Sequence, residues 1–146
     1  MMDWQNLIQQ FSECELEVNK IIVKSRLKEI ISFVSENYAF DILYEIIAVD
    51  KKELGVELIY RLYSTTNEED ALISIMVKEE AESVVDIFAS AQADENEIFD
   101  LFGIKFLGNK NLKRLYMPED WKGFPLRKDY VQDDTRLVWD DDDKNA

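Results

Sequence analysis

Four carboxylates fall within one short stretch of the chain and are its first candidates for chemistry. They are Asp94, Glu95, Glu97 and Asp100. Two carboxyl groups in unlike surroundings can serve as general acid and general base, because burial and neighbouring charges move their pKa values apart. The sequence marks no substrate cleft around these residues, and acidic faces are common on solvated helices. A free-standing carboxylate enzyme therefore stays open as one alternative.

Two further motifs imitate ligand sites without meeting their requirements. The stretch 103–110 resembles a phosphate-binding loop, but such a loop places lysine directly after its second glycine and follows it with serine or threonine. Here Asn109 separates Gly108 from Lys110. The run Asp140–Asp143 lacks the spacing and the turn glycine of a calcium-binding EF-hand. We interpret it as a solvated acidic tail.

The absence of histidine narrows the chemistry further. The 146-residue chain has no histidine and a single cysteine, Cys14. This excludes Ser-His-Asp and Cys-His nucleophiles, the HExxH zinc helix, haem ligation by histidine and iron–sulfur clusters held by this chain alone. We expect no catalytic residue, no metal ligand and no cofactor-binding residue here.

Charge and hydropathy limit the partners and the location. The chain has 17 Lys and Arg against 31 Asp and Glu, so its net charge is −14 and its isoelectric point is near 4.4. Nucleic-acid phosphates and anionic membrane surfaces repel such a chain. Residues 1–11 lack the features of a signal peptide, and no apolar stretch approaches the roughly 20 residues of a membrane span. We expect a cytoplasmic protein that does not bind nucleic acid.

The elements that must position the acidic residues begin with a strand and a helix. Residues 18–24 are rich in β-branched side chains and predict a strand. Ser25 is then expected to cap a helix that ends near Asn37. The apolar stripe of this helix consists of Leu27, Ile30, Ile31, Val34 and Tyr38.

Three strand-like runs follow, each with apolar residues at alternate positions. The second and third run from Val56 to Leu62 and from Ala71 to Val77. In the first, the residues expected to share a face are Phe40, Ile42, Tyr44, Ile46 and Ala48. The connections are too short for a helical crossover, so the strands should form an antiparallel meander. This predicts an α+β fold, a two-layer sandwich with a mostly antiparallel sheet of about four strands and packed helices.

A helical stripe returns at Ser83, with a break near residues 89–93 as an alternative, and ends at Gly103, which is a typical C-terminal stop. The stripe consists of Val84, Phe88, Ala91, Glu95, Ile98 and Phe102. Glu95 lies on this apolar face, where a buried carboxylate would need a cationic partner. We expect at least one of Glu95, Glu97 and Asp100 to pair with Arg114 or Arg127.

Beyond the stripe, the regular pattern is lost. We expect an α+β body over residues 1–104 and an extended docking arm with an acidic tail over residues 105–146, within one domain. The segment 108–129 carries a net charge of +3, whereas residues 1–107 carry −13. So long an irregular stretch is unusual in a small domain unless it has a function. We interpret it as an arm that docks on another protein, with an arm that only lies on its own body as the alternative.

The segment from Glu95 to Tyr130 carries a specific order of motifs. The motif residues, which we also expect at the interface, are Glu95, Glu97, Asp100, Phe102, Gly103, Phe106, Gly108, Arg114, Trp121, Gly123, Pro125, Leu126, Arg127, Lys128, Asp129 and Tyr130. This order resembles the 30 kDa subunit (the C subunit) family of respiratory complex I, the NADH:quinone oxidoreductase. The same family has members in energy-converting, membrane-bound [NiFe] hydrogenases of the Ech type.

The resemblance implies a non-catalytic structural and assembly subunit. Such a subunit packs against the large subunit, which is the [NiFe] catalytic subunit in hydrogenases and its quinone-site counterpart in complex I. It also lies near the small iron–sulfur subunit, in the peripheral arm on the cytoplasmic side, and reaches the membrane only through the complex. The NiFe centre or quinone site and the iron–sulfur clusters would belong to partner subunits, and this chain would be part of an oxidoreductase without an active site of its own.

Two departures from the family pattern favour the hydrogenase branch. Asn96 stands where the family has arginine, and Asn109 and Lys110 replace a His-Pro pair. With the short chain, they make an energy-converting [NiFe] hydrogenase our first expectation, coupling ferredoxin oxidation and proton reduction to ion translocation. A complex I-like quinone oxidoreductase is the main alternative, and an adaptor unrelated to redox chemistry is a remote one.

Overall fold

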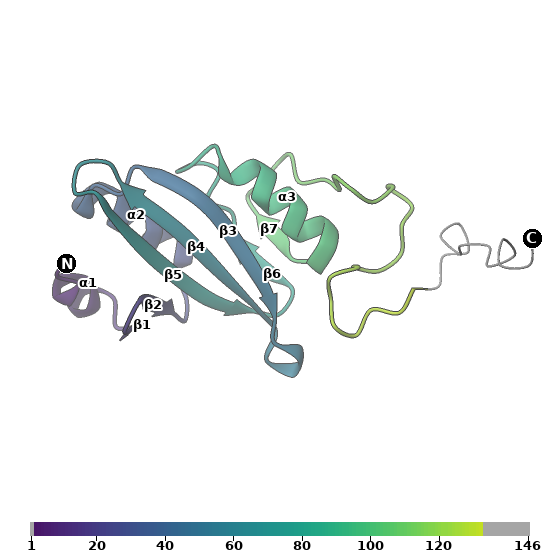
Figure 1. Cartoon of the computed structure of the whole chain (residues 1–146), viewed down its shortest axis with the longest axis horizontal. Helices are drawn as coiled ribbons and strands as arrows, with labels where there is room; N and C mark the ends of the chain where they lie inside the picture. The colour runs from purple at the N-terminus through teal and green to yellow at the C-terminus, as the bar shows by residue number, and fades with distance from the viewer. Residues whose placement is uncertain (1, 133–146) are drawn as a thin grey trace, which may run out of the picture.

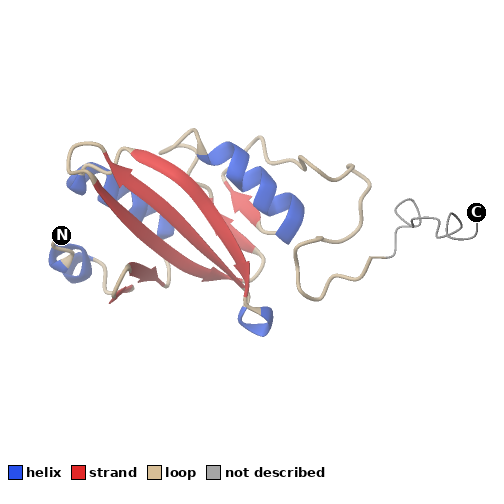
Figure 2. Ribbon diagram, viewed as in Figure 1, coloured by secondary structure: helices blue, strands red, loops and turns tan. Residues whose placement is uncertain are grey.

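The computed structural model describes residues 2–132, so the acidic run Asp140–Asp143 lies outside the described part. Within it, the predicted α+β architecture is confirmed. Helices pack against a mostly antiparallel sheet. An irregular segment projects at the end of the molecule that lies opposite the N-terminus (Figure 1 and Figure 2).

The main sheet has five strands in the order β1-β2-β5-β4-β3, one more than expected. They are β1 (Cys14–Glu17), β2 (Lys20–Val23), β3 (Ile42–Asp50), β4 (Val56–Ser64) and β5 (Glu69–Val77), with a 3₁₀ turn, η1 (Lys52–Leu54), between β3 and β4. The last three strands form the predicted antiparallel meander. β2 joins it in parallel, with Ile21 opposite Ile73 on β5.

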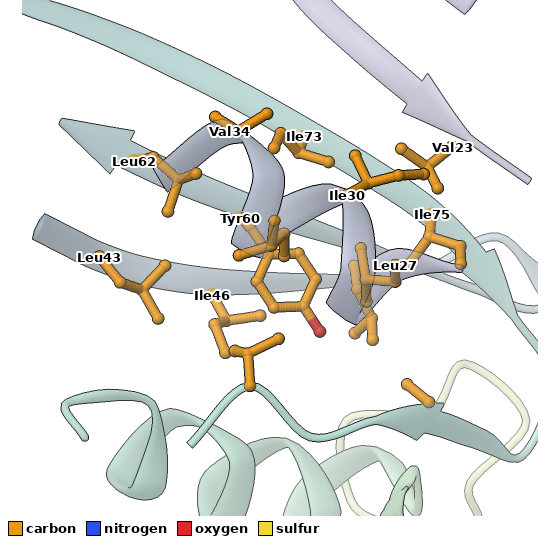
Figure 3. Close-up of a cluster of buried hydrophobic side chains, with 14 of the residues drawn as sticks. Val23, Leu27, Ile30, Val34, Leu43, Ile46, Tyr60, Leu62, Ile73 and Ile75 are labelled. Atoms are coloured by element: carbon orange, nitrogen blue, oxygen red, sulfur yellow. The ribbon is translucent and has the colours of Figure 1, made fainter. Parts of the chain in front are cut away.

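The core lies between this sheet and α2 (Leu27–Tyr38). Figure 3 shows the apolar stripe of α2 facing the inward side chains of β4 and β5. The phenol of Tyr60 lies in the middle of this layer and is fully buried, and within the described residues its hydroxyl has no hydrogen-bond partner. Burial therefore raises the pKa of Tyr60. A short helix, α1 (Gln5–Gln10), closes one end of the core with Leu7.

Two local predictions in this half are wrong. Ser25 does not cap α2, because the N-cap position is Arg26, which adopts a left-handed conformation (φ 58°) and makes no side-chain cap. In β3, Leu43 and Ile46 face the core, whereas Tyr44 is exposed. The register of β3 shifts between Leu43 and Glu45, which reverses the expected alternation at that point.

The second half contains α3 (Ala91–Phe102) and a parallel two-stranded sheet made of β6 (Glu80–Glu82) and β7 (Lys105–Leu107). The helix begins at Ala91, not at Ser83 as predicted. Residues 84–90 form turns in which the N–H groups of Ile87 and Phe88 both donate to the carbonyl of Val84, and these turns reproduce helical spacing. Gly103 ends α3 as predicted, with φ 77°.

No helix within residues 2–132 combines the length and the apolar character that a bilayer span needs.

Candidate functional site

The carboxylate of Asp100, near the end of α3, holds the start of the irregular arm. Its side chain is fully buried. One oxygen, Oδ2, accepts hydrogen bonds from the backbone N–H groups of Leu115 (3.1 Å), Tyr116 (2.7 Å) and Met117 (3.0 Å). The other, Oδ1, accepts a hydrogen bond from Arg114 Nη1 at 2.9 Å. Four donors from one loop therefore converge on a single side chain.

These donors decide the charge of Asp100. Burial alone would raise the pKa of this carboxyl group, because a low-dielectric site disfavours the charged form. The N–H groups of Met117, Tyr116 and Leu115 and the Arg114 guanidinium outweigh burial, so the pKa of Asp100 lies below its usual value. The group is a charged anchor at neutral pH.

Arg114 extends the attachment to the next part of the arm. Its Nη1 also donates to the backbone carbonyl of Asp100 at 2.9 Å. Its Nη2 donates to the backbone carbonyls of Trp121 (3.1 Å) and Gly123 (3.2 Å). The guanidinium carbon lies 5.2 Å from the centre of the Phe124 ring, within cation–π range. One planar fork thus joins the helix to two separate points of the loop.

The far end of the arm is fastened at Asp50, the last residue of β3. Its Oδ2 accepts a hydrogen bond from the Lys128 N–H at 2.7 Å and lies 3.7 Å from Arg127 Nε. The Lys128 N–H is the main reason that the pKa of Asp50 lies below its usual value. Between the two anchors, the Leu126 N–H donates to the carbonyl of Leu101 at 3.0 Å.

Glu95, five residues before Asp100, is also fully buried but has neutral partners. Its two oxygens accept hydrogen bonds from Ser83 Oγ (2.8 Å), the Val84 N–H (2.8 Å) and Asn109 Nδ2 (2.7 Å). Burial is the largest influence and raises the pKa of Glu95, and the three donors oppose it only in part. This network joins α3 to the segments that follow β6 and β7.

The two asparagines at the departures from the family motif are both structural. Asn109 supplies one of the donors to Glu95. Asn96 is buried, and its Oδ1 accepts hydrogen bonds from the Lys113 N–H and from Gln92 Nε2, each at 3.1 Å. Asn96 therefore fixes the arm one residue before Arg114.

Close packing of Gly103 also holds the arm. A Cβ added at Gly103 would lie 2.5 Å from the ring of Phe124, and the φ of 77° is one that L side chains rarely adopt. Glycine at the end of α3 thus lets the Phe124 ring lie against the backbone.

The attached arm exposes several apolar side chains among its polar ones, and a cleft lies beside it. The exposed apolar residues here are Leu107, Leu115, Tyr116, Leu126 and Val131. The cleft, of about 630 Å³, lies between the arm and the β6–β7 sheet. Its lining includes Phe102, Phe124, Tyr130 and Val131, and the cations Lys78, Lys105, Lys122 and Arg127. The carboxylates of Glu79, Glu80 and Asp129 also line the cleft, so its margin carries both signs of charge. Exposed apolar side chains with a polar margin are typical of a protein interface.

Comparison with known families identifies this arrangement. The model of the family described as the respiratory-chain NADH dehydrogenase 30 kDa subunit matches residues 21–136, which include most of the sheet and the attached arm but not β1. The chain belongs to this family.

Individual relatives agree with the family assignment. The chain is 32% identical over 120 residues to the C subunit of NADH-quinone oxidoreductase from Geobacter metallireducens, covering 78% of this chain and 74% of that one. It is 37% identical over 94 residues to the C/D subunit of the Phocaeicola vulgatus enzyme, covering 62% of this chain and 18% of the relative. It is 60% identical over 52 residues to the J subunit of NAD(P)H-quinone oxidoreductase from Prochlorococcus marinus strain MIT 9303, covering 36% and 28%. The chain thus spans well under a third of the last two.

The structure brings most of the motif residues of this respiratory-chain family member together around the arm. The predicted pairing of a helix carboxylate with an arginine is confirmed by Asp100 and Arg114. Glu95 is buried as its stripe position predicted, but the described residues give it no cationic partner, because donors from the flanking loops satisfy it. Glu97 is half-buried.

The remaining motif residues divide by exposure. Phe106 and Trp121 are buried within this chain. Phe102, Gly103, Pro125, Arg127 and Tyr130 are partly buried, and Gly108, Gly123, Leu126, Lys128 and Asp129 are exposed. Which of them meet a partner stays a prediction.

Sequence reasoning missed Asp50 and Ser83. Asp50 begins a polar turn, and nothing near it in the sequence points to Lys128. Ser83 begins the segment that resembles a helix, so its role as a donor to Glu95 was hidden by the periodic pattern. Within residues 2–132 no group of three or more His, Cys, Asp or Glu side chains is placed to hold a metal ion.

Proposed function

We propose that this member of the respiratory-chain family is the C-type subunit of a complex I-type NADH-quinone oxidoreductase, with a structural and not a catalytic role. Its arm docks on the large subunit near the small iron–sulfur subunit, in the cytoplasmic peripheral arm of the membrane complex. Relatives named as quinone oxidoreductase subunits support this assignment over the hydrogenase that the sequence first suggested.

The observation that carries the docking role is a fixed arm that exposes large apolar side chains. Asp100, Arg114 and Asp50 fasten the arm backbone to the body. Tyr116 is 62% exposed and Leu126 is 51% exposed on the segments so fastened. Aromatic side chains dominate many interfaces, and fixing them before association lowers the entropy cost of binding.

The proposal assigns the redox chemistry to other subunits. Asp100 and Asp50 are occupied with the arm, and Glu95 is enclosed by neutral donors, so these carboxylates serve attachment. The nicotinamide, quinone and iron–sulfur sites would then lie in partner subunits. Metal and flavin analysis of the purified chain should find neither in stoichiometric amount.

The test is assembly of a tagged chain with the large subunit. Tyr116→Ser combined with Leu126→Ser should reduce co-purification at least about tenfold, since two exposed apolar contacts near an interface centre are each worth about 1 kcal/mol or more. Tyr44→Ser is the matched control, because Tyr44 is 52% exposed on β3 and is not part of the arm.

Equal recovery of the double variant and the control would contradict docking through the arm. Recovery of the parent chain with a [NiFe] hydrogenase large subunit, in place of quinone oxidoreductase subunits, would overturn the assignment of the complex and leave the docking role intact.

A further inference from the structure

A second cleft lies at the opposite end of the molecule from the arm. It has a volume of about 560 Å³ and lies where α1 and the β1–β2 hairpin meet the beginning of β5 (Figure 1). The proposed docking role of the arm makes no use of this region. The apolar lining includes Trp4, Ile8, Leu16, Val18, Ala71 and Leu72.

The strand pairing explains why the cleft exists. β2 pairs with β5 only from Ile73 to Ile75. Residues 69–72 of β5 come before this paired stretch, so the hairpin diverges from them and leaves a cleft. α1 forms the other wall through Trp4 and Ile8.

The margin of the cleft exposes apolar side chains to solvent. Val18, at the tip of the hairpin, is 99% exposed, and Leu16 on β1 is 52% exposed. Exposed apolar groups at the edge of an apolar cleft mark an interaction surface, because burying them against a partner is favourable.

The charges around the cleft select the partner. Asp3, Glu17, Glu69 and Asp70 contribute four carboxylates to its lining, of which Asp70 accepts a hydrogen bond from Arg61 Nε at 3.2 Å. Among the described residues that line it, Lys20 is the one cation, and its Nζ lies 2.5 Å from Glu57 Oε1. The rim is therefore net negative, on a chain whose total charge is −14. A second copy of this chain and an anionic lipid surface would both be repelled.

We infer that this cleft binds a cationic amphipathic segment of a partner protein. Leucine- or phenylalanine-type side chains of that segment would cover Trp4, Leu16 and Val18, and its lysines or arginines would face the carboxylate rim. Because the cleft and the arm lie at opposite ends of the molecule, one chain can engage two partners at once.

The test uses the full chain and a defined probe. A fluorescein-labelled 14-residue peptide of lysine and leucine, with the leucines on one helical face, is titrated with the chain at 0.15 M salt and followed by anisotropy. We expect saturable one-to-one binding. Glu17→Lys should weaken it about tenfold, and Leu16→Ser combined with Val18→Ser should weaken it at least as much.

The matched control separates the cleft from general attraction between opposite charges. Glu119→Lys changes the net charge by the same amount but lies on the exposed part of the arm, and it should weaken binding less than about twofold. Equal weakening by Glu17→Lys and Glu119→Lys, equal binding of a glutamate–leucine peptide, or absence of saturable binding would each overturn the inference. None of these outcomes bears on the arm, so the proposed function is tested separately.

Discussion

The two halves of α3 bury one carboxylate each, and they do so in opposite ways. Glu95 receives three uncharged donors, and the pKa of Glu95 is raised. Asp100 receives a guanidinium and three backbone N–H groups, and the pKa of Asp100 is lowered. Neither side chain is accessible to solvent, but Glu95 lies deeper, and its uncharged donors only partly offset burial, whereas the donors of Asp100 outweigh it.

The difference follows what each half must hold. The partners of Glu95 flank the small β6–β7 sheet, which backbone hydrogen bonds already define. The partners of Asp100 belong to a segment that has no helix or strand of its own. Charge-assisted hydrogen bonds are roughly twice as strong as neutral ones. On α3, the charged carboxylate therefore lies where regular secondary structure cannot supply stability.

The largest expected effect is that of Asp100→Asn. The substitution leaves Arg114 without its buried carboxylate and turns an amide toward N–H donors. We expect a loss of about 3–5 kcal/mol in the free energy of unfolding, the cost of breaking a buried pair from one side. Urea unfolding measures it, with Asp86→Asn, which affects an exposed pair with Lys28, as a control expected to leave stability unchanged.

The sign of the pH dependence follows from the lowered pKa of Asp100. Its stabilisation is fully present above the unfolded-state pKa, near 3.8, and is lost as the pH falls through the lower folded-state pKa. Asp100→Asn should therefore flatten the acid limb of the stability curve. An unchanged acid limb would mean that Asp100 is not the charged anchor.

Gly103→Ala tests whether the close packing of Phe124 on the end of α3 stabilises the attachment of the arm, in addition to the hydrogen bonds of Asp100. We expect a loss of about 2–5 kcal/mol, from a left-handed alanine (about 1–2) and an overpacked Phe124 ring (about 1–3). Gly108→Ala is the control: its φ is 93°, but no atom lies within 4 Å of the added Cβ. It should cost only the backbone component, about 1 kcal/mol. Equal losses in thermal unfolding would show that the ring can move away freely.

Arg114→Lys separates two contributions of Arg114 to the attachment of the arm: its positive charge and the forked geometry of its guanidinium. Lysine keeps the charge near Asp100 but cannot also reach the carbonyls of Trp121 and Gly123. We expect a loss of about 2 kcal/mol. Amide exchange should become faster from Lys122 to Phe124, while the amides of residues 115–117, which donate to Asp100, stay slow. Uniform acceleration along the whole arm would contradict two separate attachments.

Glu95→Gln should have the smallest effect. Glutamine is uncharged, like the protonated acid that burial favours at this position, so the free energy of unfolding should change by less than about 1 kcal/mol. The parent chain loses stability as the pH rises from the unfolded-state value of 4.5 to the higher folded-state pKa of Glu95. Across that pH range, the stability of the variant should therefore rise relative to that of the parent chain. If Glu95→Gln lowered the free energy of unfolding as much as Asp100→Asn, the two carboxylates would not differ in the way proposed.

Much of the body could be predicted because its signals are local. Alternation in β4 and β5 and the stripe of α2 each repeat within a few residues, and the structure follows them. The register shift in β3 and the turns before Ala91 escaped the same reasoning. One displaced residue reverses a strand pattern, and isolated turns imitate a helix.

The sequence predicted several residues of the site but not most of the contacts between them. Motif positions pointed to Asp100 and Arg114, and Glu95 was expected to be buried. Sequence could not show that Asn109 would take the place of a cation at Glu95, because that depends on where the chain returns after β7. The contact between Asp50 and Lys128 joins positions 78 residues apart, and no local pattern encodes it.

That long-range contact also sets an order of events during synthesis. The strands of the main sheet can pair once β5 has been made. The carboxylates of Asp50 and Asp100 cannot bind the arm until residues 114–128 have left the ribosome. Contacts of large sequence separation form late, since a long loop must close before they repay its entropy. A nascent chain therefore passes through a stage in which the sheet has formed but the carboxylates of Asp50 and Asp100 have not yet bound the arm. The surface proposed to dock on a partner is completed last, so assembly cannot run ahead of folding.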